Sequence, residues 1–159
     1  MTPDQSALVA KLKTPKECEQ FAINVDARGK PELASAARRR SVELRALEHH
    51  AGSDVEREAL EAVYAYERVL SETAGKKVRA SGTWQMIKKR GLIPAVEHVV
   101  SRREETTGYT ALVKMGMEDM LFEAVVDRHP EAFSEAALER SRARLRELKN
   151  PSEPIVDGD

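Results

Sequence analysis

The chain has 159 residues, of which 41% are hydrophobic and 33% are charged, and its formal net charge is −1. This composition predicts one well-solvated domain with a real core, and the single cysteine, Cys18, excludes an internal disulfide and a multi-cysteine zinc site. No segment approaches the roughly 20 apolar residues that span a bilayer, and the N-terminus has no signal-peptide pattern. We therefore expect a soluble, cytoplasmic protein that does not act at a membrane.

Caps, prolines and glycines divide the first half of the sequence into four predicted helices, at about 4–12, 15–28, 31–50 and 53–74. The second begins where Thr14 can cap the chain and Pro15 can occupy the first helical position. The fourth begins at the capping box formed by Ser53 and Glu56. Helical spacing predicts a buried stripe along this helix, made of Val55, Ala59, Val63, Tyr66 and Leu70.

The second half of the sequence predicts shorter helices, at about 83–90, 94–102, 109–115, 117–128 and 135–148. Gly91 separates the first two of these, and Pro94 suits the start of the second. The helix at 117–128 is apolar around so much of its surface that we expect it to lie at the centre of the core. No segment shows the alternating pattern and turn residues of a β-hairpin.

Together these patterns predict an all-α fold, a compact bundle of about seven to eight short helices. The loops are short, so helices adjacent in sequence should pack antiparallel to one another. We expect a single helical domain over residues 1–150, and the sequence leaves open whether 1–52 forms a separate N-terminal helical hairpin lobe. Residues 151–159 are rich in proline and acidic groups, which predicts a flexible acidic tail.

Positive charge is concentrated in one segment of the chain. Residues 76–103 carry eight basic side chains and one acidic side chain, Glu97, whereas residues 1–75 and 104–159 are net −2 and −6. Basic residues gathered in this way are typical of a surface that contacts nucleic-acid phosphates. The candidate nucleic-acid-binding residues are the basic residues of this segment and one histidine: Lys76, Lys77, Arg79, Lys88, Lys89, Arg90, His98, Arg102 and Arg103.

The stretch "TWQMIKKRGLIPAVEHVV" at 83–100 resembles a helix-turn-helix, with a short helix, a glycine turn and a second helix that carries apolar valines. The resemblance implies a helix-turn-helix-like pair at about 83–102 whose second helix enters the major groove of DNA. Most of the positive charge, however, lies on the first helix and on the chain leading to it. That distribution suits contact with the phosphate backbone better than the reading of base edges.

Each feature of the basic segment also has a structural explanation. Its charge can form a solvated face of the bundle that pairs with the acidic C-terminal half. Trp84 is the only tryptophan, and it can either anchor the core or stack on a base. Its apolar neighbours Met86 and Ile87 favour packing in the core.

The arginine-rich stretch "ARRRSVELR" at 37–45 suits a solvated helix face. Glu43 can pair locally with Arg39, and Glu48 can pair with Arg45. This stretch therefore predicts ion pairs within the chain rather than a binding site for another molecule.

Acidic side chains recur at every fourth residue of the predicted helix at 117–128, namely at Asp119, Glu123 and Asp127. On so apolar a helix we expect them to form its one solvated face, or to pair with the basic segment. A metal site would require further ligands opposite these carboxylates.

The sequence contains no P-loop, GxGxxG, GxSxG or HExxH motif. We therefore predict no catalytic residue, no metal ligand and no cofactor, and rank an enzyme built on acidic residues below a binding module. The main hypothesis is a nucleic-acid-binding or regulatory module, with DNA as the expected partner. The alternative is a helical protein–protein interaction module without catalytic activity, which presents a groove to another protein.

Overall fold

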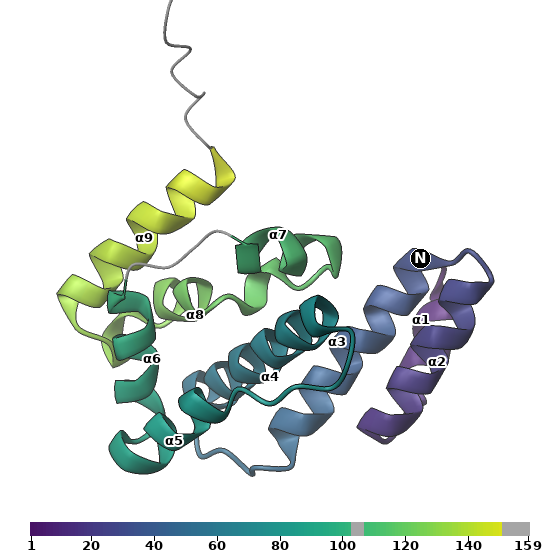
Figure 1. Ribbon diagram of the computed structural model, residues 1–159, viewed down its shortest axis with the longest axis horizontal. Helices are drawn as coiled ribbons and strands as arrows, with labels where there is room; N and C mark the ends of the chain where they lie inside the picture. Colours follow the sequence, from purple (N-terminus) through teal and green to yellow (C-terminus); the bar gives the residue numbers. More distant parts are fainter. Residues whose placement is uncertain (103–106, 151–159) are drawn as a thin grey trace, which may run out of the picture.

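The computed structural model describes residues 1–102 and 107–150, and every regular element in these ranges is a helix (Figure 1). The elements are α1 (Pro3–Ala10), α2 (Pro15–Ala27), α3 (Pro31–Leu47), α4 (Asp54–Ala74), α5 (Ser81–Arg90), α6 (Leu92–Ser101), α7 (Thr107–Lys114), η1 (Glu118–Met120), α8 (Phe122–Arg128), η2 (Pro130–Ala132) and α9 (Glu135–Lys149), where η marks a short 3₁₀ helix. The all-α prediction is confirmed. The described residues form nine α-helices, as many as the segments predicted one by one and slightly more than the bundle of seven to eight expected. The tail predicted at 151–159 lies outside them.

Side-chain caps begin two of the longer helices where the sequence predicts them. Thr14 Oγ1 accepts a hydrogen bond from the Glu17 amide at 3.1 Å, at the start of α2. Ser53 Oγ accepts one from the Glu56 amide at 3.3 Å, at the start of α4. Such caps satisfy amides that have no partner within the helix. α4 ends at Gly75, whose φ of 69° lies in the left-handed region that glycine adopts without steric cost.

α5 and α6 occupy the segment that resembles a helix-turn-helix. They are joined by Gly91 alone, at a φ of 93°. α6 begins at Leu92, earlier than predicted, so Pro94 lies in its first turn, where the missing amide removes no helical hydrogen bond. The buried residues of α6 are Ala95, Val96, Val99 and Val100. One face of α6 therefore packs in the core.

The helix predicted at 117–128 is interrupted. η1 occupies its start, Leu121 is extended at φ −61° and ψ 145°, and α8 begins only at Phe122. Met117 and Met120, before the break, pack in one core cluster, and the residues of α8 pack in another. A straight helix would carry both sets of apolar side chains around one axis, so the break allows each set to face its own cluster.

The core is built around α4. Its Ala59 and Val63 pack in one cluster with α6 and α8, and its Ala65 and Val69 pack in a second cluster with α3 and the residues around η1. A third cluster joins α1, α2 and α3. Figure 1 shows α4 in the middle, with α3 on one side and α8 on the other. Of the predicted stripe, Ala59 and Val63 are buried, Val55 and Leu70 are half-buried, and Tyr66 is 38% exposed.

Arginines make the ion pairs that join separate helices. Arg39 of α3 donates to Asp119 of η1, with Nη1 and Oδ1 2.7 Å apart, and to the Gly116 carbonyl at 3.2 Å. Arg128 of α8 donates to Glu58 of α4 at 2.6 Å. No lysine of the described ranges takes part in an ion pair. The planar guanidinium suits this role because it binds a carboxylate through more than one fixed donor.

The acidic residues predicted to share one solvated face have different environments. Asp119 pairs with α3, and Asp127 pairs with Arg142 of α9 at 2.8 Å. Glu123 is only 3% exposed, and its Oε1 lies 3.9 Å from Nε of Arg144. The prediction of a solvated face is therefore wrong at Glu123, because the break before α8 turns this residue inward. The ion-pair partners that the structure describes for these three carboxylates lie on α3 and α9.

Two of the carboxylates that join helices are held in the ionised form. The hydrogen bond from Arg39 lowers the pKa of Asp119, against burial, which would raise it. Burial raises the pKa of Glu58, but the hydrogen bonds from His129 and Arg128 outweigh it, and the net pKa is lowered. A carboxylate with a lowered pKa in the folded state stabilises the fold above its unfolded pKa. That contribution is lost as the pH falls through the folded pKa.

We predict that the free energy of unfolding is nearly constant between pH 7 and about pH 5 and falls below about pH 4.5, near the ordinary pKa of a glutamate. Asp119→Asn should lose about 0.5–1 kcal/mol at neutral pH, because the pair is partly exposed, and should show a weaker dependence on pH. Urea unfolding followed by circular dichroism at neutral pH and at about pH 3.5 measures both effects.

The matched control is Glu139→Gln, which removes the charge of an exposed carboxylate that pairs with no described residue. It should retain the wild-type stability and pH profile. An Asp119→Asn profile as steep as that of the wild type would contradict the role assigned to Asp119.

Candidate anion-binding site

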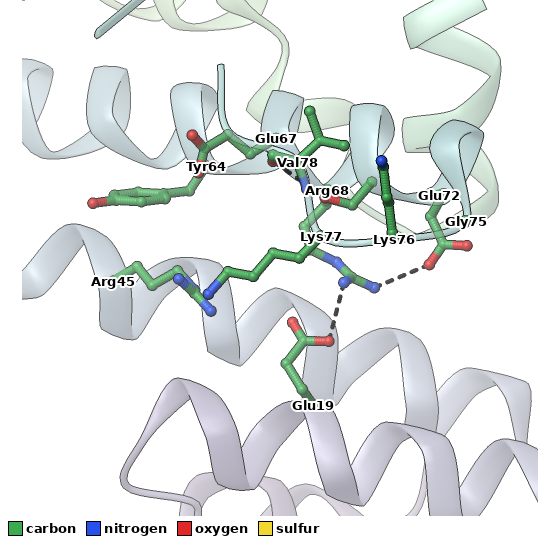
Figure 2. Close-up of a pocket in the computed structure, with 11 residues that line it drawn as sticks. Glu19, Arg45, Tyr64, Glu67, Arg68, Glu72, Gly75, Lys76, Lys77 and Val78 are labelled. Atoms are coloured by element: carbon green, nitrogen blue, oxygen red, sulfur yellow. Dashed lines mark hydrogen bonds and ion pairs between the residues drawn. The ribbon is translucent and has the colours of Figure 1, made fainter. Parts of the chain in front are cut away.

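A pocket of about 440 Å³ opens where the loop after α4 passes over α3 and α2 (Figure 2). Its walls are formed by Glu19 of α2, Arg45 of α3, the face of α4 from 64 to 72 and the loop that follows α4. Four basic and three acidic side chains line the pocket, with a tyrosine and a serine between them. Two of the predicted binding residues, Lys76 and Lys77, are among the basic ones.

Two side chains of α4 hold the loop over the pocket. Ser71 Oγ accepts a hydrogen bond from the Val78 amide at 2.9 Å and donates one to the Val78 carbonyl at 3.3 Å. Glu67 Oε2 accepts from the Ala80 amide at 2.8 Å and from Trp84 Nε1 at 2.7 Å. The loop and the start of α5 are therefore fastened to α4, and this determines where the lysines of the loop lie.

The acidic side chains of the pocket already have partners. Arg68 lies between Glu19 and Glu72, with a guanidinium nitrogen 3.0 Å from an oxygen of each (Figure 2). Glu67 holds the two donors just described, and Nε of Arg79 lies 3.9 Å from its Oε2. These carboxylates thus neutralise Arg68 and fasten the loop.

Three cations of the pocket, Arg45, Lys76 and Lys77, form no ion pair with any described residue. Figure 2 shows the Lys77 side chain extending across the pocket toward the Arg45 guanidinium, while Lys76 projects from the same loop in another direction. Like charges that face each other repel, and an anion bound between them would replace this repulsion by attraction. The pocket therefore has the electrostatics of an anion-binding site.

A second basic group lies at the end of α5. Lys88, Lys89 and Arg90 are exposed in its last turn, and none of them pairs with a described carboxylate. The helix dipole favours cations at this end. α5 has ten residues, about 15 Å of helix, and in Figure 1 it leads away from the loop that crosses α4. The second group is therefore separated from the pocket by the length of this helix.

The other predicted binding residues join neither group. Arg79 is exposed, and its guanidinium carbon lies 5.8 Å from the centre of the Trp84 ring. His98 is half-buried on α6. Arg102 follows α6 and lines a separate cleft, and Arg103 lies outside the described residues. The structure thus places the predicted residues in two basic groups and at several single positions.

The sequence does not predict Arg45 as a site residue, and assigns it Glu48 as a local partner. That pair is not among the ion pairs of the described residues, and Arg45 lines the pocket instead. The other local pair predicted on α3, Arg39 with Glu43, is present at 3.9 Å. Arg45 precedes Lys76 by about 30 residues, and no spacing pattern links the two. Only the packing of α3 against α4 brings them together.

Trp84 anchors the start of α5 to the core, as its apolar neighbours predict. Its ring packs against the cluster formed by α4, α6 and α8, and its Nε1 donates to Glu67. His49, which follows α3, lies parallel to this ring, with the two ring centres 5.7 Å apart and an interplanar angle of 4°. The alternative prediction, in which Trp84 itself stacks on a base, is less compatible with these contacts.

A larger and more apolar cleft, of about 710 Å³, lies between α4, α7, α8 and α9. Its lining includes Leu70, Phe122 and Leu148, and Val78 is shared with the anion pocket on the other side of the loop. Apolar clefts of this kind are where small molecules or the apolar face of a partner helix bind.

Three further observations bear on the functional class. Within residues 1–102 and 107–150, no three His, Cys, Asp or Glu side chains are placed to hold a metal ion. None of the helices that the structure describes is long and apolar enough to cross a bilayer. The chain matches no protein-family model, no curated protein and no solved structure.

We predict that Glu67→Ala lowers the free energy of unfolding by about 1–3 kcal/mol, because the Ala80 amide and the Trp84 indole lose their acceptor in a partly buried setting. The fluorescence of Trp84 should shift to longer wavelength as α5 loosens from α4. Glu72→Ala is the control, since this carboxylate is 53% exposed and its loss should cost about 0.5 kcal/mol or less. Equal effects of the two substitutions would refute the role assigned to Glu67.

Proposed function

We propose that this protein is a non-catalytic nucleic-acid-binding module, with DNA as the expected partner, that contacts backbone phosphates through two basic groups. The first group is Arg45, Lys76 and Lys77 in the pocket, and the second is the end of α5. Phosphate oxygens accept several hydrogen bonds at once, so the guanidinium and ammonium groups of these side chains are suitable donors.

The observation that carries this proposal is that the cations of the described residues fall into two sets, those paired with carboxylates of the chain and those that are not. Arginines that join helices, such as Arg39, Arg68 and Arg128, are neutralised within the chain. The cations of the two basic groups are not. Glu97, the acidic residue nearest in sequence to the end of α5, accepts a hydrogen bond from the Ser134 amide. Clustered cations without an internal partner attract a polyanion, which releases condensed counterions when it binds.

The arrangement of α5 and α6 favours phosphate contact over groove reading. The single-residue turn at Gly91 is shorter than the three to four residues usual in a helix-turn-helix. One face of α6 packs in the core, and its His98 is half-buried. We therefore assign the contact to the exposed end of α5, with α6 as its support.

The apolar cleft supports a second candidate, a helical protein–protein interaction module. An amphipathic helix of a partner could lay its apolar face against Leu70, Phe122 and Leu148. Binding of that kind depends mainly on buried apolar area and only weakly on salt, whereas phosphate contacts depend on salt steeply. A salt titration therefore separates the two candidates.

We predict that replacing Lys88, Lys89 and Arg90 together by alanine weakens binding of a short duplex DNA about tenfold or more at moderate salt. The plot of log affinity against log salt should become less steep by about 2–3, because each lost phosphate contact contributes about 0.9. Fluorescence anisotropy of a labelled duplex at several salt concentrations measures both quantities. Circular dichroism should show unchanged helicity.

The charge-matched control replaces three exposed lysines by alanine, Lys11 and Lys13 between α1 and α2 and Lys16 in α2. This variant changes the net charge equally and should retain the wild-type affinity and slope. If the two triple variants bind DNA equally, or if the wild type binds no DNA at low salt, the proposal is wrong.

The two basic groups should contribute independently. We predict that the loss of affinity in Lys76→Ala/Lys77→Ala adds to that of the α5 triple variant in the combined variant, because residues far apart usually have additive effects. The same anisotropy titrations measure this. A combined loss no greater than that of the triple variant alone would show that the pocket does not take part.

A further inference from the structure

An aromatic side chain with an exposed position adjoins the anion pocket. His49 Nε2 lies 2.7 Å from the hydroxyl of Tyr64, which lines the pocket. The His49 ring lies parallel to that of Trp84, and Tyr64 packs against both rings at a tilt. His49 is thus held in one orientation by a hydrogen bond and by two aromatic neighbours, although it is exposed in the turn that follows α3.

Trp84 supports this group rather than offering its own ring. Its indole nitrogen donates to Glu67, its ring packs against the core, and the Arg79 guanidinium lies over it. His49 contacts Trp84 and Tyr64 but is itself exposed. The ring that a planar ligand can reach is therefore that of His49.

Tyr64 links this ring to the cations of the pocket. His49 lies in the turn that follows α3, where its amide donates to the Ala46 carbonyl at 3.1 Å. Its Nε2 lies 2.7 Å from the Tyr64 hydroxyl, and Tyr64 lines the pocket together with Arg45. A phosphate group held by Arg45 and Lys77 would therefore have an aromatic surface within one nucleotide of it.

We infer that the pocket binds single-stranded nucleic acid, with a phosphate held by Arg45, Lys76 and Lys77 and a base stacked on the exposed face of His49. This inference rests on the proposed function and adds the form of nucleic acid that the site prefers. A base in a duplex is stacked on its neighbours, so only an unpaired base can reach an aromatic side chain. A basic pocket beside a stacking surface is the usual arrangement for binding single strands without base readout.

The experiment compares an oligothymidylate of about 12 nucleotides with a duplex of the same length, because single-strand sites commonly cover about 4–16 nucleotides. Trp84 is the only tryptophan and lies against His49, so its fluorescence reports on the site without a label. We expect the single strand to quench this fluorescence and to bind more tightly than the duplex.

The variants separate stacking from charge. His49→Ala should weaken binding of the single strand about tenfold and leave duplex binding unchanged, whereas His49→Phe, which keeps an aromatic ring, should retain most of the affinity. The control is His50→Asn, since His50 is also exposed, and its φ of 51° is one that asparagine tolerates. Arg45→Gln should weaken single-strand binding as well, through the phosphate.

The outcomes distinguish this inference from the proposed function. Equal binding of duplex and single strand, with His49→Ala as tight as the wild type, would overturn the inference and leave phosphate binding intact. Equal binding of a sulfated polysaccharide, again unaffected by His49→Ala, would assign the pocket to polyanions in general and also overturn it. Absence of binding to either nucleic acid at low salt would refute the proposed function itself.

Discussion

The carboxylate of Glu67 is the interaction on which the position of the basic segment depends. It accepts hydrogen bonds from the Ala80 amide and the Trp84 indole, so one side chain of α4 fixes both the end of the loop and the beginning of α5. α4 itself contributes residues to two core clusters. The loop that carries the lysines and the beginning of α5 are thus held by a helix that packs in the core. In the proposed function, such a support means that little conformational entropy is lost when a ligand orders the basic segment.

The distribution of charge follows from which cations the fold uses. Arginines of α3, α4, α8 and α9 bind carboxylates that lie on other helices or one turn away. Most of these pairs are partly exposed, so each contributes little to stability. Their larger effect is that the carboxylates are already paired with arginines. With those carboxylates already paired, the lysines of the loop and of the end of α5 form no ion pair with a described residue. A chain with a net charge near zero thereby gains a local surface that favours anions.

Helix boundaries that depend on neighbouring residues could be predicted from the sequence, whereas features that depend on packing could not. The caps at Thr14 and Ser53 and the glycine after α4 depend on neighbouring residues, so the helix boundaries there were predictable. The break at Leu121 depends on two core clusters that face different directions, and a single periodic pattern cannot reveal it.

The site shows the same difference between local and long-range information. Lys76 and Lys77 were predicted from charge density alone. Arg45 lies on α3, whose pattern is that of an ordinary solvated helix, and His49 lies in the turn after it. Both come near the pocket only because α3 packs against α4. The helix-turn-helix likeness identified a real pair of helices, α5 and α6. A repeat of apolar positions, however, does not specify the length of the turn between two helices or the face that remains exposed.

Arginines and lysines have different roles in this fold, and the difference bears on how modification of lysines would affect the protein. Every side-chain ion pair in the described residues is made by an arginine or a histidine, whereas most cations of the two basic groups are lysines, namely Lys76, Lys77, Lys88 and Lys89. Acetylation neutralises a lysine ammonium group and leaves an arginine guanidinium untouched. An acetyltransferase acting on these four exposed amines would abolish much of the attraction for polyanions while every salt bridge of the scaffold stayed in place.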